Sequence, residues 1–430
     1  MKFLVESYLS VISKKNVLNQ AAIMTGARIL GLALGAVGMV WAARCLGPKN
    51  LGLSGMVQNV VVQASLLIGI ISPTVLVREY KNAKSEKAKN RLVQATNGFR
   101  LLLATVLCAI AGLIMGFGLV PSAYRFAGWF FIPIFLLTSI QPTWIFQATE
   151  KQHFQSMIAV IQPALAALLY LVWFKPGMSA GADLLVNSIV AIVMTIILWK
   201  AVYKLSILKE AFFKFDQMKE ILALIYRSRW LFMSVFAIYI YTILEQPLLG
   251  WLYSLEELGK YRTAVNATNA AQAFFTIIPV ILYPRFIEWR KRGEDILWRR
   301  QLKLAAFFSV GGGLISLLGF VIIPFLYPVV FGLAFAQAAI PCAILFLSKI
   351  VVIITGIFYW GLVTDDRHDR YLSLAMLGTA FLSLFLNLIL IPKWGMYAAS
   401  TVNLTSEFIV LIVCIHASIV RTRSRVLKRF

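Results

Sequence analysis

The sequence Thr149-Glu150-Lys151-Gln152-His153 recurs 215 positions later as Thr364-Asp365-Asp366-Arg367-His368, and each copy follows an apolar run of membrane-spanning length. The echo continues after the next such run, where Lys175-Pro176-Gly177-Met178 is answered by Pro392-Lys393-Trp394-Gly395-Met396. The spacing is half of the 430 residues, which indicates two diverged copies of one unit.

Two pairs near the start of each half support this duplication. Leu51-Gly52 is matched by Leu258-Gly259 and Arg78 by Arg285, both at an offset of 207. The offset changes along the chain because the loops of the two halves differ in length. An internal repeat set in apolar sequence is typical of membrane transporters built from two related halves.

The composition places the chain in a membrane. Hydrophobic residues make up 60% of it and charged residues 14%, and the mean hydropathy is +0.81. A soluble domain has about 25% charged residues. Because an apolar helix of roughly 20 residues crosses the hydrocarbon core, we expect an all-α polytopic membrane protein with about twelve transmembrane helices. The expected spans are 17–43, 51–77, 100–120, 127–148, 156–174, 184–203, 225–253, 261–284, 304–328, 336–363, 371–391 and 396–420.

The repeat predicts two six-helix lobes, at residues 1–210 and 211–430. The connection 204–224 lies between them and is basic and amphipathic, which suits a linker on the inner membrane surface. The predicted outer connections are short throughout, so we expect no extracytoplasmic domain that captures a soluble ligand.

The net charge of +23 is distributed as in a multi-pass membrane protein. With the N-terminus inside, the inner connections and both tails hold 32 of the 41 lysines and arginines, and seven lie outside. Basic residues are retained on the cytoplasmic side, so both termini are expected in the cytoplasm. The basic loops suit anionic membrane lipids. We expect no nucleic-acid partner, because the sequence has no zinc spacing, RNA-binding strand or helix-turn-helix pattern.

No catalytic motif competes with the transport signal. The sequence has no Walker A pattern, which excludes an ATPase of the P-loop type. The four cysteines lie in or at the ends of spans without close pairing, and the three histidines are scattered. We therefore expect neither an enzyme, nor a metal site, nor a cofactor.

Four ionisable residues fall inside the predicted spans, where a charge costs roughly 2.5–3.5 kcal/mol. They are Arg28, Glu245, Lys349 and Glu407. One interpretation is structural ion pairing, for which Glu245 and Lys349 are candidates. The other is a polar cavity between the lobes, in which Arg28 and Lys349 attract an anionic group while Glu245 binds or relays a cation. Glu407 is expected to be structural, because the last span lies at the lobe periphery in most two-lobe arrangements.

Further polar residues suit a cavity wall. Tyr239, Tyr241 and Glu245 share a span with Gln246-Pro247, whose proline kinks a helix and frees a carbonyl, although tyrosines near a membrane surface are also ordinary anchors. The amides within or near spans would line a cavity or form interhelical hydrogen bonds worth about 0.6 kcal/mol each. They are Gln58, Asn59, Gln63, Gln141, Gln162, Asn266, Asn269 and Gln272.

Three degenerate motifs occur in a recognisable order. Residues 43–52 read Ala-Arg-Cys-Leu-Gly-Pro-Lys-Asn-Leu-Gly and match A-R-x-L-G-P-x-x-L-G. Residues 255–264 match S-x-x-E-x-G-x-Y-x-x-A in part, with Pro284 where P-x-(F/L) follows, and residues 387–399 match L-N-x-x-L-I-P-x-x-G-x-x-G-A-A in part. Together these stretches resemble Wzx-type polysaccharide flippases of the multidrug/oligosaccharidyl-lipid/polysaccharide exporter superfamily, and the similarity covers nearly the whole chain.

This resemblance implies a V-shaped bundle of two lobes that rocks between inward- and outward-open states. The implied cargo is an oligosaccharide on undecaprenyl diphosphate, moved from the cytoplasmic to the periplasmic leaflet of a bacterial inner membrane for surface polysaccharide biosynthesis (O-antigen, capsule or exopolysaccharide). The implied partners are this lipid-linked glycan, membrane lipids, a glycan polymerase and other surface-polysaccharide assembly proteins. Na⁺ or H⁺ would serve as the coupling ion.

The resemblance also assigns residues. Arg28 matches an arginine in the first-helix S-R-x-L-G of lipid II flippases, which engages diphosphate there; the second arginine of that branch is absent from residues 32–35, which favours another glycan. Glu245 stands where Wzx-like proteins have an acidic residue in helix seven and is the ion-coupling candidate. Arg78 and Arg285 would meet diphosphate at the cytoplasmic mouth or act as positive-inside anchors. The substrate-binding candidates are Arg28, Lys349, Arg78, Arg285, Tyr239 and Tyr241.

The alternative is a multidrug or small-molecule cation-coupled antiporter of the same superfamily, because it shares this architecture. Cavity charge separates the two, since exporters of cationic drugs need acidic or apolar cavities and flippases need basic ones. Drug exporters often carry an acidic residue in the first helix, and this chain has none there. A membrane-bound glycan polymerase or ligase should have a large extracytoplasmic loop, which the sequence lacks.

Overall fold

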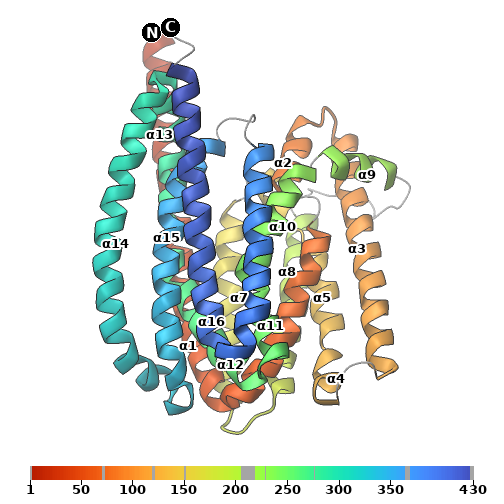
Figure 1. The fold of residues 1–430 in the computed structure, drawn as a ribbon. Helices are drawn as coiled ribbons and strands as arrows, with labels where there is room; N and C mark the ends of the chain where they lie inside the picture. Colours follow the sequence, from red (N-terminus) through yellow and green to blue (C-terminus); the bar gives the residue numbers. More distant parts are fainter. Residues whose placement is uncertain are drawn as a thin grey trace.

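A computed structural model describes residues 2–69, 73–118, 122–149, 152–204, 218–227, 229–275, 277–363 and 369–426, and these residues form helices and short connections without a strand (Figure 1). The first half contains α1 (Lys2–Ile68), α2 (Pro73–Asn82), α3 (Glu86–Gly116), α4 (Ser122–Gly128), α5 (Phe131–Ser139), α6 (Thr143–Ala148), α7 (Gln152–Trp173) and α8 (Ala180–Lys204). The rest comprises α9 (Met218–Arg227), α10 (Arg229–Ile243), α11 (Glu245–Leu252), α12 (Leu255–Phe275), α13 (Ile277–Arg292), α14 (Glu294–Phe331), the 3₁₀ helix η1 (Leu333–Ala338), α15 (Ala339–Val363) and α16 (Asp369–Val426).

The expected all-α polytopic membrane fold is confirmed. Seven helical stretches of the described chain are long and apolar enough to cross a membrane, and the longest two, Ile29–Ile68 and Leu372–Thr422, each contain two crossings joined at a kink. With α7, the α10–α11 pair and the α12–α13 pair, the described helices occupy all twelve predicted spans.

Two glycines make those kinks. Gly47 (φ 71°) interrupts α1 and Gly395 (φ 52°) interrupts α16, a backbone region that only glycine enters without strain. Figure 1 shows each helix reversing direction at this point. We call the end of the molecule that carries both glycines the kink end. The two chain ends lie together at the opposite end, the terminus end.

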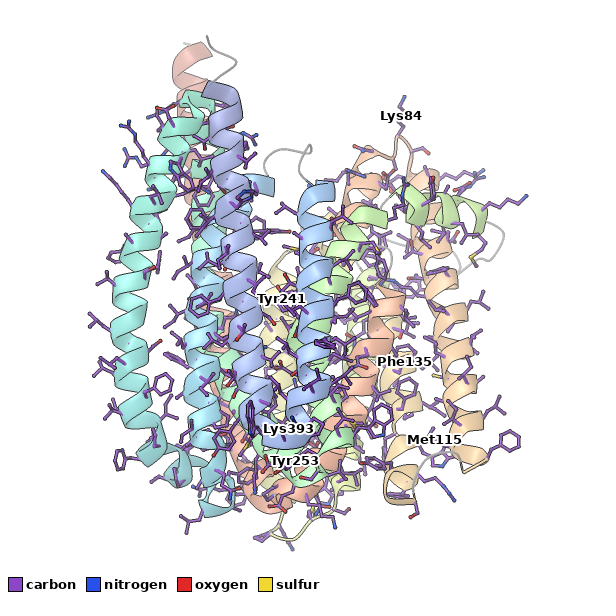
Figure 2. All side chains as sticks on the ribbon, viewed as in Figure 1. Lys84, Met115, Phe135, Tyr241, Tyr253 and Lys393 are labelled. Atoms are coloured by element: carbon purple, nitrogen blue, oxygen red, sulfur yellow. The ribbon has the colours of Figure 1, made fainter. Side chains whose placement is uncertain are left out.

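The connections alternate between these ends as the sequence predicted. Lys84, in a predicted inner connection, lies at the terminus end, whereas Tyr253 and Lys393 lie at the kink end (Figure 2). Which end faces the cytoplasm rests on the charge distribution and stays a prediction.

The two halves share a hydrophobic core at the kink end. It joins Ala42–Leu51 of α1 and residues of α7 and α8 to residues of α11, α12, α14, α15 and α16, among them Leu249, Tyr261 and Met396. Other clusters lie within one group of helices, such as Val57, Phe131 and Leu184 in the first half. The halves are therefore held together mainly where the chain makes its kinks.

The two halves approach each other closely at two repeat-related glycines. A Cβ at Gly52 would lie 1.7 Å from the Leu255 carbonyl oxygen, and one at Gly259 would lie 1.8 Å from that of Pro48. Both pairs follow the offset of 207, so equivalent positions of the two halves contact each other reciprocally. The backbones of α1 and α12 touch, which is the geometry that small residues allow between membrane helices.

Some boundaries differ from expectation. α3 begins at Glu86 rather than near residue 100, because its first turns carry polar residues that hydropathy assigns to a loop. Arg100, counted among the inner-loop cations, is buried in this helix. The α9 part of the predicted linker packs through Ile221 and Leu224 on the first-half core. The domain boundary at 210/211 and most of the pentapeptide repeat at 149–153 and 364–368 lie outside the described residues, and the boundary stays a prediction.

The glycine contact generates a stability test. Gly259→Val should destabilise the folded protein by more than the roughly 1–3 kcal/mol of ordinary overpacking, because a backbone oxygen of α1 occupies the space. Gly378→Val in α16 is the matched control, since nothing lies within 4 Å of a Cβ there. The measurement is the thermal unfolding midpoint in detergent. Equal midpoints for the two variants would show that the helices do not touch at this point.

Candidate functional site

A cavity of about 640 Å³ lies along α12, from Arg262 near the kink end to Gln272. Apolar and polar side chains both line it, and we call it the polar cavity after the polar ones. Its walls come from α1, α10, α11, α15 and α16 as well as α12 and Phe286 of α13. Seven amide side chains line it, more than any other polar type: Gln58, Asn59, Gln246, Asn266, Asn269, Gln272 and Asn403. Each amide can both donate and accept hydrogen bonds, so the wall suits a neutral polyhydroxylated ligand.

Glu245 sits in this wall because Pro247 breaks the helix before it. Proline has no N–H for the carbonyl of Ile243, so α10 ends there and α11 begins at Glu245, as the sequence predicted. The carboxylate is 1% exposed. It accepts a hydrogen bond from the Tyr261 hydroxyl at 2.7 Å and from the Asn403 amide at 3.2 Å, and Asn403 accepts one from Ser348 Oγ at 2.7 Å. Three helices thus hold this carboxylate in place.

Lys349 and Glu407 line the same cavity. The described side chains form no ion pair between Glu245 and Lys349 within 4.0 Å, although Lys349 interacts electrostatically with both carboxylates across the cavity. The expectation that Glu407 is peripheral was wrong, since it is buried and faces the cavity from α16. The kink at Gly395 folds the last helix back inside its lobe, which hydropathy does not reveal.

The charged lining of the described cavity is balanced rather than basic. Arg262 and Lys349 supply two positive charges, and Glu245 and Glu407 supply two carboxylates. The side chain of Arg28 lies outside the described residues, and so its proposed place in the cavity stays a prediction.

The remaining predicted residues divide between cavity and surface. Tyr241 lines the cavity, whereas Tyr239 is not part of its wall, since residues two apart on a helix face different sides. Arg78 is exposed on α2 beside Glu79, and Arg285 is exposed on α13; neither belongs to the wall. Of the eight predicted amides, five line the cavity; Gln63, Gln141 and Gln162 do not, and Gln141 instead bonds Thr195 between helices at 3.5 Å.

A second hollow of about 640 Å³ is an apolar groove between helices of the first half and helices of the second half. α1 and α7 form one side through Gly31, Met39 and Pro163, and α14 and α15 form the other through Leu326 and Phe346. Both hollows are lined by Asn266, Thr268 and Asn269 of α12. The polar cavity and the apolar groove therefore share one wall.

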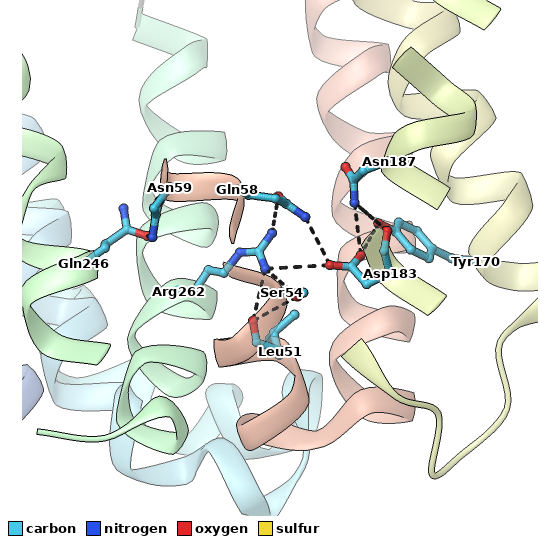
Figure 3. A network of polar contacts seen from close by, with 9 residues as sticks. All are labelled: Leu51, Ser54, Gln58, Asn59, Tyr170, Asp183, Asn187, Gln246 and Arg262. Carbon is cyan, nitrogen blue, oxygen red and sulfur yellow. Dashed lines mark hydrogen bonds and ion pairs between the residues drawn. The ribbon is translucent and has the colours of Figure 1, made fainter. Parts of the chain in front are cut away.

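A polar network closes the cavity toward the kink end (Figure 3). Arg262 of α12 donates to the Leu51 carbonyl at 3.1 Å, to Ser54 Oγ at 3.0 Å and to Gln58 Oε1, all on α1. Asp183 of α8 lies 3.8 Å from the same guanidinium. The expected spans placed Arg262 at the start of the eighth, 261–284, and Asp183 just before the sixth, 184–203, and sequence reasoning selected neither as a site residue. The available signal was a charge at the edge of an apolar run.

Comparisons with known proteins agree with this architecture. The family model described as "Polysaccharide biosynthesis protein" matches residues 17–289. The chain belongs to this family. Among relatives of this polysaccharide biosynthesis protein is the "Putative O-antigen transporter" of Escherichia coli (strain K12), 21% identical over 376 residues, which cover 86% of this chain and 89% of the relative.

Two solved structures share the fold of this family member. The lipid II flippase MurJ in an inward closed conformation superposes with a TM-score of 0.74 at 13% identity, over 92% of this chain and 87% of the other. An inward-facing multidrug resistance MATE transporter of the MOP superfamily gives 0.66 at 11% identity, over 94% and 98%. The fold that the resemblance to this superfamily implied is confirmed. By name, one neighbour is a lipid flippase and the other a multidrug transporter.

Proposed function

We propose that this polysaccharide biosynthesis protein is a flippase. It moves an oligosaccharide linked to undecaprenyl diphosphate from the cytoplasmic to the outer leaflet by alternating access. The observation that carries the proposal is the wall that the amide-rich cavity and the apolar groove share at Asn266–Asn269. A ligand with a polar head and an apolar chain needs two such hollows side by side.

The head of this cargo fits the chemistry of the cavity. Amide groups exchange hydrogen bonds with sugar hydroxyls, and Tyr241, Tyr359 and Trp360 add aromatic surface to the wall. A diphosphate carries about two negative charges, which the bilayer core cannot hold without partners. Lys349 and Arg262 are the described cations that face the cavity. The isoprenoid chain would lie in the apolar groove, which is open between the lobes.

One observation favours the alternative, a cation-coupled antiporter for small molecules. Glu245 and Glu407 place two carboxylates in the cavity, which would attract a cationic drug. The preponderance of amides over acids and the family membership favour the glycan cargo.

The orientation follows from the distribution of charge. We propose that the terminus end faces the cytoplasm of a bacterial inner membrane, because the connections there hold most lysines and arginines. Reporter fusions at Lys2 and at Phe430 should both be active as cytoplasmic reporters. A periplasmic signal from either fusion would invert or break this topology.

The cargo is tested in a cell that needs this protein for a surface glycan. Arg28→Ala should abolish glycan export at normal protein level, and Lys349→Ala should reduce it less, because Lys349 also interacts with the cavity carboxylates. Arg28→Lys keeps the charge but loses the bidentate fork for phosphate oxygens, so it should restore export in part. Arg299→Ala, an exposed cation on α14, is the control that should export normally.

The same set is assayed in proteoliposomes that contain an undecaprenyl-diphosphate oligosaccharide, with a cationic dye as the competing substrate. Flipping of the lipid without dye transport supports the flippase. Dye transport without flipping would establish the antiporter.

Glu245 is the proposed site of a coupling cation, Na⁺ or H⁺, because it is a buried carboxylate within the cavity wall. Glu245→Gln should make flipping insensitive to imposed Na⁺ and pH gradients while the protein stays folded. Glu256→Gln is the matched control, since that carboxylate is exposed and pairs with Lys260, and neither residue lines the cavity. If the wild-type flipping rate does not depend on either gradient, or if the Gln variant keeps the dependence, then Glu245 binds no coupling cation and serves only as a structural hydrogen-bond acceptor.

A further inference from the structure

Arg262 belongs both to the wall of the polar cavity and to the contact between the two halves. Its side chain lines the polar cavity, and the same guanidinium binds the opposite half of the molecule through Leu51, Ser54 and Gln58. Gly55 makes room for it, since a Cβ there would lie 2.8 Å from Arg262 Cδ. The residue therefore stands at the floor of the cavity and in the contact that closes the kink end (Figure 3).

The groups that hold Arg262 by hydrogen bonds are neutral. They are a backbone carbonyl, a hydroxyl and an amide oxygen. The nearest carboxylate, Asp183, is 3.8 Å away, beyond hydrogen-bond distance, and the Gln58 side chain links the two by accepting from Arg262 and donating to Asp183. The guanidinium is thus held by three neutral acceptors and by one long ion pair with Asp183 (Figure 3).

These partners remain satisfied when Arg262 leaves. Asp183 keeps hydrogen bonds from Tyr170 OH at 2.6 Å, Gln58 Nε2 at 3.1 Å and Asn187 Nδ2 at 3.3 Å. The Leu51 carbonyl keeps the bond from Ser54 Oγ at 3.1 Å. Release of Arg262 therefore strands no buried carbonyl. It breaks the long ion pair with Asp183, and the three donors that Asp183 keeps offset part of that cost.

A phosphate oxygen is a better partner than any of the three acceptors. A phosphate adds a Coulomb attraction to the guanidinium that the three neutral acceptors lack, and the guanidinium fork fits phosphate bidentately. A diphosphate that enters the cavity competes for this guanidinium. The bound diphosphate and the contact that closes the kink end therefore need the same N–H donors of Arg262.

We propose that Arg262 couples the arrival of cargo to opening of the kink end. In the empty cavity it ties α12 to α1; when a lipid-linked diphosphate binds, the guanidinium turns to the phosphate and the tie is released. This inference rests on the proposed flippase function and adds the residue that detects the anionic head. Arg262 thus holds the two halves together before the cargo binds and contacts the phosphate of the cargo afterwards.

The test uses a cysteine probe in the closed contact. Leu51→Cys is buried in the core that joins the halves. Cys45 and Cys342 belong to the same core and are replaced by alanine, so that the probe alone reports on it. The reaction of the probe with a water-soluble maleimide reports opening of the kink end in purified protein. Undecaprenyl diphosphate should accelerate this reaction at least about fivefold, the low end of ordinary coupling. Undecaprenol, which lacks the phosphates, should have no effect, and inorganic diphosphate tells whether the lipid chain is required.

Variants of the cation decide whether Arg262 is responsible. With Arg262→Gln the probe should react rapidly without ligand and should not respond to the lipid. Arg262→Lys should respond weakly, because it keeps the charge without the fork. Lys260→Gln is the matched control on the same helix, since Lys260 binds Glu256 and Gln337 within its own half; it should behave as the parent. Ser54→Ala, which keeps the arginine, should raise the basal rate and retain the response.

The outcomes separate this coupling from the function beneath it. Binding of undecaprenyl diphosphate, measured as a shift in the unfolding midpoint, without faster labelling would overturn the coupling and leave the flippase intact. A Gln variant that still responds to the lipid would also overturn it. Absence of lipid binding to the parent protein would refute both proposals together.

Discussion

The reciprocal contact between Gly52 and Gly259 constrains the rest of the structure. Two helix backbones touch there, which leaves room for neither side chains nor lipid, and the adjoining core around Leu249, Tyr261 and Met396 is the main hydrophobic link between the halves. Because the contact lies at one end, the helices are free to separate toward the other end. The cavity and the groove exist in that space. The motifs around these glycines thus encode a junction between the halves that borders the cavity.

Within this frame, the polar groups of the cavity are supported by donors from several helices. Glu245 depends on a broken helix at Pro247 for its position and on Tyr261 and Asn403 for its hydrogen bonds. A buried carboxylate without such donors would be costly. The same helix, α12, carries Tyr261 toward this acid, Arg262 toward the opposite half and Asn266–Asn269 toward both hollows. The first half of the eighth span therefore contributes to the carboxylate site, to the contact between the halves and to both hollows.

Sequence alone predicted the helical class, the twelve spans and the duplication, because hydropathy and repeat spacing are local or strictly periodic signals. It also found Glu245, Lys349 and Tyr241, since an ionisable or kink-associated residue in an apolar run is conspicuous. It missed Arg262, Asp183 and Arg100, which lie at or next to the predicted ends of spans, where a charge is ordinary. It also misjudged Glu407, because the side of a helix that faces a cavity depends on how the chain folds back at Gly395. The equal number of positive and negative side chains in the cavity wall likewise depends on how the helices assemble, so the sequence did not reveal it.

The reciprocal pairs Pro48–Gly259 and Gly52–Leu255 have a consequence for how such a chain can change. They are the contact of an isologous dimer, in which each surface meets its own copy, here written into one polypeptide. In a true homodimer an arginine at one position would be forced on both subunits and would face itself across the axis. Fusion removes that obligation: position 262 carries arginine while its counterpart, 207 residues earlier, is Gly55, which leaves the space that the guanidinium fills. Two halves within one chain can therefore carry different residues at equivalent positions of a symmetric contact, whereas two identical subunits cannot.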